Sequence, residues 1–131
     1  MILLDTCAII WDALAPEQLS RKAAKAIVRA EEQNALIISD ISLWEVAMLI
    51  EKKRLKTSES ASHLLNLFLA SRSVAVKAIT PEVAELSVNF GPELNKDPAD
   101  RIIAATAIVN NARLVTADQN LIANPMVDTV W

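Results

Sequence analysis

Short apolar runs alternate along the chain with longer stretches in which apolar residues recur at helical spacing. Each run has the length of a strand, and most are continuously apolar, which is typical of strands buried on both faces of a sheet. The predicted strands cover residues 2–4, 35–39, 74–79, 113–116 and 126–131. This order of strand and helix signals predicts an α/β fold with a central, mostly parallel β-sheet flanked by helices.

Capping signals mark where the intervening helices begin and end. Ser42 and Glu45 match a capping box, in which each side chain bonds the backbone N–H near the other. Thr80 and Asp97 each precede a proline, a combination that favours a helix N-terminus, and Gly91 follows the stretch that Thr80 opens. The predicted helices cover residues 16–33, 42–54, 58–71, 81–90 and 99–111.

The 131 residues contain no repeat, low-complexity segment or linker, so we expect one domain that spans residues 1–131. Cys7 is the single cysteine, which excludes an internal disulfide and favours a reducing compartment. The N-terminal apolar run lacks a basic segment and is interrupted by Asp5, unlike a secretory signal, and no apolar stretch is long enough to span a membrane. We therefore expect a cytoplasmic protein without a membrane partner.

The net charge of −3 argues against a protein that coats nucleic acid by charge alone. It does not exclude a nuclease, because carboxylates that bind a metal ion count as negative charge in this sum. The mean hydropathy of +0.29 indicates either an aliphatic core or an apolar surface that contacts another subunit.

Several carboxylates lie where the predicted strands end. Asp5 follows the first strand, Asp118 follows the fourth, and Glu45 lies in the first turn of the helix after the second. Ligands of parallel sheets bind beyond the carboxyl ends of the strands. Asp97 and Asp100, three residues apart at another helix start, can face in the same direction. We therefore expect four or five carboxylates to converge.

A cluster of carboxylates repels itself in water, and the usual reason to build one is a hard divalent cation. Mg²⁺ takes oxygen ligands and can bring a water to nucleophilic strength in phosphodiester hydrolysis. The residues alone indicate an acidic metal site without naming its reaction.

Structural roles explain several of these carboxylates equally well. Asp97 is a good helix cap, Asp100 is a favourable first-turn charge, and the capping box accounts for Glu45. Asp118 can form a turn that caps a short helix near the C-terminus. Asp5 is the hardest to explain structurally, because a carboxylate directly after a buried strand is costly without a partner.

Four segments of the chain resemble the motifs of the PIN-domain family, in the family's order and with similar spacing. These segments are Leu3–Trp11 (LLDTCAIIW), Ser39–Ala47 (SDISLWEVA), Asp97–Ala107 (DPADRIIAATA) and Leu114–Asp118 (LVTAD). The match covers nearly the whole chain, and the four segments together are far more specific than any one of them.

The resemblance implies a PIN fold and a Mg²⁺- or Mn²⁺-dependent endoribonuclease of the VapC type, the toxin of a type II toxin–antitoxin pair. An RNA substrate and a cognate antitoxin are the implied partners, and a homodimer is favoured. By position, Asp5 and Asp100 are the first expected metal ligands. Glu45 and Asp118 complete the catalytic acidic pocket directly or through water, whereas the role of Asp97 as a ligand stays ambiguous.

Nearby polar residues have both functional and structural interpretations. The hydroxyls of Thr6, Ser39 and Thr116 would bond the neighbouring carboxylates or satisfy backbone groups. Arg101 would contact a phosphate or pair with a carboxylate. The basic cluster at residues 52–56 would contact an RNA backbone or form a solvated helix end.

Two other functions compete with the nuclease. An aspartyl-phosphate receiver or phosphatase would use Asp5 as a nucleophile, but such sites need a second carboxylate close by, and the neighbours here are Leu4 and Cys7. They also need a lysine near the late strand, where the sequence has none. A catalytically silent binding module of the same fold is not favoured, because all four acidic motif positions are occupied.

Overall fold

The computed structural model describes residues 1–131. Five strands form one sheet in the order β3-β2-β1-β4-β5, and every neighbouring pair is parallel. The strands are β1 Ile2–Leu4, β2 Leu36–Ser39, β3 Ala75–Lys77, β4 Arg113–Val115 and β5 Thr129–Val130. The predicted α/β fold is therefore confirmed, with a sheet that is parallel throughout.

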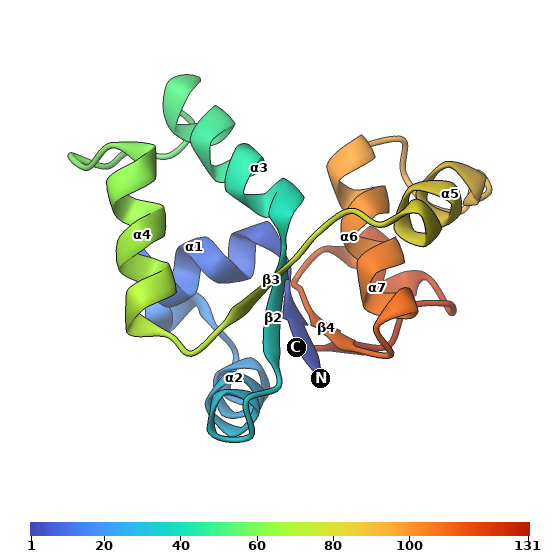
Figure 1. Cartoon of the computed structure of the whole chain (residues 1–131), viewed down its shortest axis with the longest axis horizontal. Helices are drawn as coiled ribbons and strands as arrows, with labels where there is room; N and C mark the ends of the chain where they lie inside the picture. The colour runs from blue at the N-terminus through green and yellow to red at the C-terminus, as the bar shows by residue number, and fades with distance from the viewer.

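Seven α-helices surround the sheet (Figure 1). They are α1 Thr6–Leu14, α2 Arg21–Glu32, α3 Asp40–Glu51, α4 Ala61–Ser71, α5 Pro81–Asn89, α6 Pro98–Val109 and α7 Gln119–Ala123. A short 3₁₀ helix, η1, covers Pro16–Gln18. None of these helices has the length and apolar character that crossing a lipid bilayer requires.

The strands divide the apolar residues between two cores, because successive side chains of a strand point to opposite faces. Leu3 of β1 is paired with residues of β2 and β4 that face the same way, and these pack against α5, α6 and α7. The next residue, Leu4, belongs to the other core, which packs against α1, α2 and α4. Helices thus cover both faces of the sheet, as Figure 1 shows.

Helix α1 is the one long element that the sequence pattern does not predict. It begins directly after Asp5, which acts as its N-cap, and it buries Ala8 and Ile9 against the sheet. Its sequence, TCAIIWDAL, is rich in residues with modest helix propensity. The burial of one face of α1 against the sheet, rather than the helix propensity of its residues, therefore determines its conformation.

The single helix predicted for residues 16–33 is wrong. Residues 16–18 form the 3₁₀ helix, the chain extends at Leu19, and α2 begins after Ser20. The Ser20 hydroxyl accepts a hydrogen bond from the Ala23 backbone N–H at 3.0 Å, which makes Ser20 an N-cap that starts a separate helix.

The carboxyl ends of the central strands meet at one edge of the sheet because these strands are parallel. Asp5 follows β1, Ser39 ends β2 and Thr116 follows β4. All three side chains are buried. This edge is where the predicted site residues come together.

Candidate active site

A cleft of about 430 Å³ lies at the carboxyl edge of the sheet. Its walls come from α1, α3, the start of α6 and the loop after β4. All five carboxylates that the sequence singles out line it: Asp5, Glu45, Asp97, Asp100 and Asp118. Four separate segments of the chain therefore deliver acidic side chains to one cavity.

Asp5 lies at the bottom of the cleft and is only 4% exposed. Its Oδ1 accepts a hydrogen bond from the Thr6 backbone N–H at 2.8 Å, and its Oδ2 accepts one from the Thr116 hydroxyl at 2.7 Å. Burial raises the pKa of Asp5, while these two hydrogen bonds lower it. The buried Asp5 carboxylate thus finds its partners in the first backbone N–H of α1 and in the hydroxyl of the threonine that follows β4.

Thr116 connects two of the carboxylate-bearing segments. Its hydroxyl donates to Asp5 and accepts from the Asp118 backbone N–H at 3.0 Å. Asp118 in turn caps α7, since its Oδ1 accepts from the backbone N–H groups of Asn120 at 2.8 Å and Leu121 at 3.2 Å. The helix-cap prediction for Asp118 is correct, and the same side chain also lines the cleft.

Glu45 does not belong to a capping box, so that prediction is wrong. Helix α3 begins three residues earlier than the box requires, and Ser39 is its N-cap, accepting from the Ile41 N–H at 3.3 Å. Ser42 is buried inside the helix, where its hydroxyl lies 3.0 Å from that of Thr6. The Thr6 hydroxyl donates to Glu45 Oε1, so Glu45 points into the cleft instead of back along its own helix.

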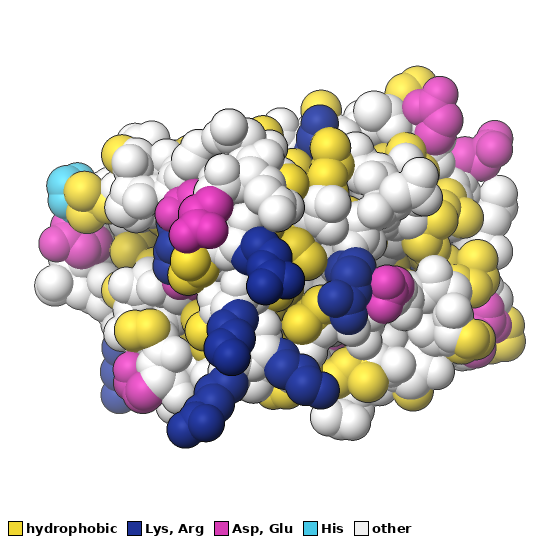
Figure 2. All heavy atoms as spheres, turned by 90° about the horizontal axis from the view of Figure 1, so that it is seen from below, with side chains coloured by type: hydrophobic (Ala, Val, Ile, Leu, Met, Phe, Trp, Pro, Cys, Tyr) yellow, Lys and Arg dark blue, Asp and Glu magenta, His cyan; other side chains and the backbone are white.

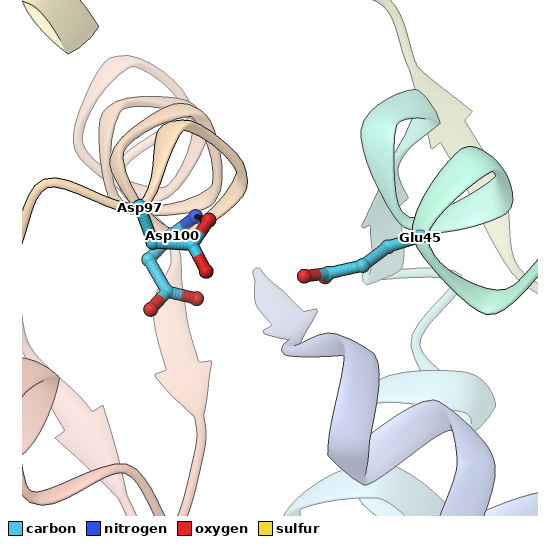
Figure 3. Close-up of side chains that lie close together, drawn as sticks. All are labelled: Glu45, Asp97 and Asp100. Carbon is cyan, nitrogen blue, oxygen red and sulfur yellow. Dashed lines mark hydrogen bonds between the residues drawn. The ribbon is translucent and has the colours of Figure 1, made fainter. Parts of the chain in front are cut away.

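Asp97 and Asp100 lie at the start of α6, opposite Glu45. Figure 3 shows Glu45 reaching from α3 toward these two aspartates. One carboxylate oxygen from each of the three residues lies within 4.8 Å of the others. Asp97 is also the N-cap of α6, because its Oδ1 accepts from the Ala99 N–H at 2.9 Å and the Asp100 N–H at 3.4 Å. The cap and the cluster are compatible, since a carboxylate has two oxygens.

Four of the five carboxylates share one arrangement. A protein donor holds one oxygen of Glu45, Asp97, Asp100 and Asp118, and the other oxygen has no hydrogen-bond partner within the protein. The side chains are thus oriented and still have lone pairs to offer. That arrangement suits the binding of a cation better than it suits helix capping alone.

The carboxyl of Asp100 is half-buried and lies near the charges of other carboxylates of the cleft. Burial raises its pKa to about 7, the hydrogen bond from Asn95 lowers it, and the charges of Asp5, Asp97 and Asp118 raise it. The pKa of Glu45 is also raised, chiefly by burial. Like charges that share a partly buried site oppose each other's ionisation, and a bound cation would relieve this repulsion.

Asn95 is a site residue that the sequence analysis missed. Its side-chain amide donates to Asp100 Oδ2 at 2.9 Å, and its carbonyl oxygen Oδ1 accepts from the Asp97 N–H at 2.9 Å. Its own backbone N–H donates to Asn120 Oδ1 at 2.8 Å. Asn95 lies two residues before the helix start at Asp97-Pro98. In the sequence, an asparagine at that place indicates only a turn and not a site residue.

Arg101 neither contacts the cleft nor pairs with a carboxylate, which corrects both interpretations of this residue. Its guanidinium donates to five backbone carbonyls of the segment before α6. The shortest of these bonds, 2.7 Å, goes to the carbonyl of Asn95. Arg101 therefore holds in place the loop that carries Asn95.

The donor set of the cleft fits a hard divalent cation. Carboxylate oxygens are the ligands that Mg²⁺ and Mn²⁺ prefer, and no histidine lines the cavity. The one thiol, Cys7, donates to Asp5 Oδ2 at 3.6 Å, and burial raises its pKa to about 12. Cys7 is therefore a neutral donor to Asp5 and not a thiolate ligand.

Comparison with known proteins agrees with this geometry. The model of the PIN domain family matches residues 2–125. Ribonuclease VapC22 of Mycobacterium tuberculosis is 36% identical over 132 residues, which cover 99% of this chain and 98% of that protein.

Solved structures show the same fold at lower sequence identity. The crystal structure of VapBC2 from Rickettsia felis, bound to a DNA fragment from its promoter, superposes with a TM-score of 0.75 at 21% identity and covers 98% of this chain and 97% of the other. A toxin–antitoxin complex from Klebsiella pneumoniae gives a TM-score of 0.64 at 24% identity, with coverages of 97% and 95%. Because the family model and the VapC22 match both span nearly all of it, the chain belongs to the PIN domain family, among relatives of the VapC type.

Proposed function

We propose that the chain is a Mg²⁺- or Mn²⁺-dependent endoribonuclease that acts as a toxin and is neutralised by a cognate antitoxin. The observation that carries the proposal is the set of five oriented carboxylates in one cleft, four of which keep an oxygen without a protein partner. The similarity to Ribonuclease VapC22 supports RNA as the substrate. One domain over residues 1–131 performs this activity.

We assign the metal-binding role to Asp5, Glu45, Asp100 and Asp118, with Asp97 beside them. Asp5 anchors the bottom of the cleft and Asp100 faces Glu45 across it. When bound, Mg²⁺ or Mn²⁺ supplies Lewis-acid stabilisation and an acidified water for phosphodiester hydrolysis. The protein's part is to fix the oxygen ligands and to place the phosphodiester beside them.

The geometry favours hydrolysis over an aspartyl-phosphate mechanism. Asp5 would be the nucleophile of such an enzyme, but it is 4% exposed and both of its oxygens accept hydrogen bonds. Attack on a phosphoryl group requires an accessible lone pair. Asp5 is therefore poorly placed to act as the nucleophile of a covalent intermediate.

Cleavage of a mixed, structured RNA pool tests the enzymatic part. We expect wild-type protein, purified free of any partner, to cut RNA with Mg²⁺ or Mn²⁺ and to be inactive in EDTA. Asp100→Asn removes one carboxylate of the cluster and should reduce cleavage at least about 100-fold, since oriented ligands act as a unit. Glu85→Gln, an equal charge change on an exposed residue of α5 outside the cleft, is the matched control. Cleavage that survives in Asp100→Asn would contradict the assignment.

The toxin role and the partners are tested in cells and by mass measurement. Expression of wild-type protein should arrest bacterial growth, expression of Asp100→Asn should not, and co-expression of the proposed cognate antitoxin, to be sought among small reading frames beside the gene, should restore growth. We also propose a homodimer, which the mean hydropathy of +0.29 and exposed apolar side chains such as Trp44 and Val88 support. Light scattering that gives a monomer mass at micromolar concentration would contradict the dimer.

A further inference from the structure

A second concave surface, distant from the carboxylate cleft, is lined by basic side chains. This groove has a volume of about 400 Å³ and lies between α2, the start of β4 and the end of β5. Its charged lining consists of Lys22, Lys25, Arg29 and Arg113, and no acidic residue lines it. Figure 2 shows Lys and Arg side chains gathered in the middle of this face. We call these four residues the α2 basic groove.

The cations of α2 are not neutralised within the protein. Lys22, Lys25 and Arg29 are exposed and make no salt bridge, while Arg113 pairs only with the exposed Asp128, at 3.3 Å. The other acids near this end, Glu31 and Glu32, follow Arg29, and Glu31 is paired with Arg72. Three unpaired cations at one concave surface are notable in a chain whose net charge is −3.

The surface that attracts the substrate and the cleft that hydrolyses it differ in charge. The five carboxylates of the cleft repel a phosphodiester chain until a cation neutralises them. Affinity for a polyanion must therefore come from another surface, and positive charge supplies most of the non-specific binding of nucleic acids. We propose that the α2 basic groove binds the phosphate backbone of the RNA that the carboxylate cleft cuts. This inference rests on the proposed ribonuclease function.

The groove and the cleft lie at opposite ends of β4. Arg113 begins β4 and Asp118 lies five residues later, so their Cα atoms are at most about 18 Å apart. An RNA strand that contacts both surfaces has to follow the outside of the molecule, because the β4 residues between them are buried. On α2, Lys22, Lys25 and Arg29 are three and four residues apart, which places the charges at intervals of about 4.5 and 6 Å along one side of the helix. A row of cations at such intervals suits the regular charges of a phosphate backbone.

Charge reversal on α2 tests the proposal. Binding of a 20-nucleotide single-stranded RNA of mixed sequence is measured in EDTA, so that nothing is cut, over a series of salt concentrations. The variant is K22E/K25E/R29E. K52E/K53E/R54E makes the equal charge change at the other basic cluster, just after α3, and S62E/N66E on the exposed face of α4 is the charge-matched control for the two-charge variant K25A/R29A. We expect the α2 variant to bind at least tenfold more weakly, with a log–log salt slope shallower by about 2, because three phosphate contacts are lost.

Several results would overturn the proposal. Equal losses in K25A/R29A and S62E/N66E would show that net charge alone matters, and unchanged binding in the α2 variant would remove the groove from RNA recognition. If the α2 variant binds RNA as tightly as wild type but no longer binds polyglutamate, the groove is a docking site for an acidic protein instead. The milder K25A/R29A variant guards against misfolding, and its slope should change by about 1.4. The two proposals fail separately. Wild-type protein that does not cut RNA in the presence of metal would refute the proposed function, whereas the binding results in EDTA test only the groove.

Discussion

In the metal-free protein, the carboxyls of Asp5, Glu45 and Asp100 all have raised pKa values, and burial is the largest cause for each. A carboxyl whose pKa is higher in the folded than in the unfolded state binds more protons when folded. Its stabilising contribution is complete below the unfolded value near 3.8 and is lost as the pH rises through the folded value, about 7 for Asp100.

The metal-free protein should therefore become less stable between about pH 4 and pH 7.5. For a fully buried group, a rise of the pKa from 3.8 to about 7 corresponds to about 4 kcal/mol in the free energy of unfolding. Asp100 is partly exposed, so we expect its contribution to be about 1–2 kcal/mol. Urea unfolding in EDTA at several pH values measures it. Asp100→Asn should flatten the profile and Glu85→Gln should not. A profile that rises with pH over this range would contradict the pKa directions.

Asn95 should act as a positioning residue for Asp100. Asn95→Ala removes the donor to Asp100 Oδ2 and the acceptor for the Asp97 N–H, so the two carboxylates at the start of α6 lose their orientation. Loss of such supporting bonds typically costs 10–100-fold in metal affinity or activity. Calorimetric Mn²⁺ titration of the folded variant checks this, with the exposed Asn66→Ala as control. Wild-type Mn²⁺ affinity in Asn95→Ala would show that its role is only structural.

At the residue scale, the sequence predicts which carboxylates reach the site better than it predicts what holds them. Asp5, Glu45, Asp97, Asp100 and Asp118 all line the cleft as expected. Their partners come from remote parts of the chain, as when Thr116 donates to Asp5 across 111 positions. Such pairs follow from the sheet order, which a local pattern does not contain.

The end of α3 is held in a conformation that its sequence does not favour. Lys53 has a φ of 56°, in the left-handed region where a side chain costs about 1–2 kcal/mol and where glycine usually ends a helix. The two other non-glycine residues with positive φ, Asn34 and Asn111, tolerate this region better. Lys53 therefore stores strain at an exposed helix end.

Lys53→Gly should stabilise the fold by about 0.5–1 kcal/mol, because relief of the left-handed strain exceeds the added freedom of the unfolded chain. The neighbouring Lys52→Gly is the matched control: Lys52 has a φ of −81°, so glycine gains nothing there and should destabilise slightly. Thermal unfolding of both variants gives the answer. Equal effects of the two substitutions would exclude backbone strain as the cause.

At the element scale, prediction succeeds where a cap and a periodic pattern agree. Thr80 and Asp97 cap α5 and α6 as expected, each followed by a proline. Prediction fails at α1 and at the start of α3, where the chain turns directly from a strand into a helix at the edge of the sheet. There Asp5, which follows β1, and Ser39, which ends β2, are the caps of the helices that start at once. Because α1 and α3 start directly at the edge of the sheet, Thr6 and Glu45 lie in the cleft.

For the whole molecule, the parallel sheet explains why residues distant in sequence form one site. The order β2-β1-β4 places Ser39, Asp5 and Thr116 side by side at one edge. Acidic charge collects at that edge, whereas the α2 basic groove lies beyond the start of β4. The sequence indicates the acidic edge through its motifs. It does not reveal the groove, because Arg113 is 84 positions from Arg29 and only the fold joins them.

Binding of Mn²⁺ in the absence of RNA tests the central claim most directly, because it requires no knowledge of which RNA is cut. Mn²⁺ is titrated into metal-free wild type, Asp100→Asn and the control Glu85→Gln, and free Mn²⁺ is followed by electron paramagnetic resonance. We predict saturable binding to wild type and Glu85→Gln, and binding at least about tenfold weaker to Asp100→Asn. Equal binding to all three proteins, or no saturable binding to wild type, would contradict a metal site in the carboxylate cleft.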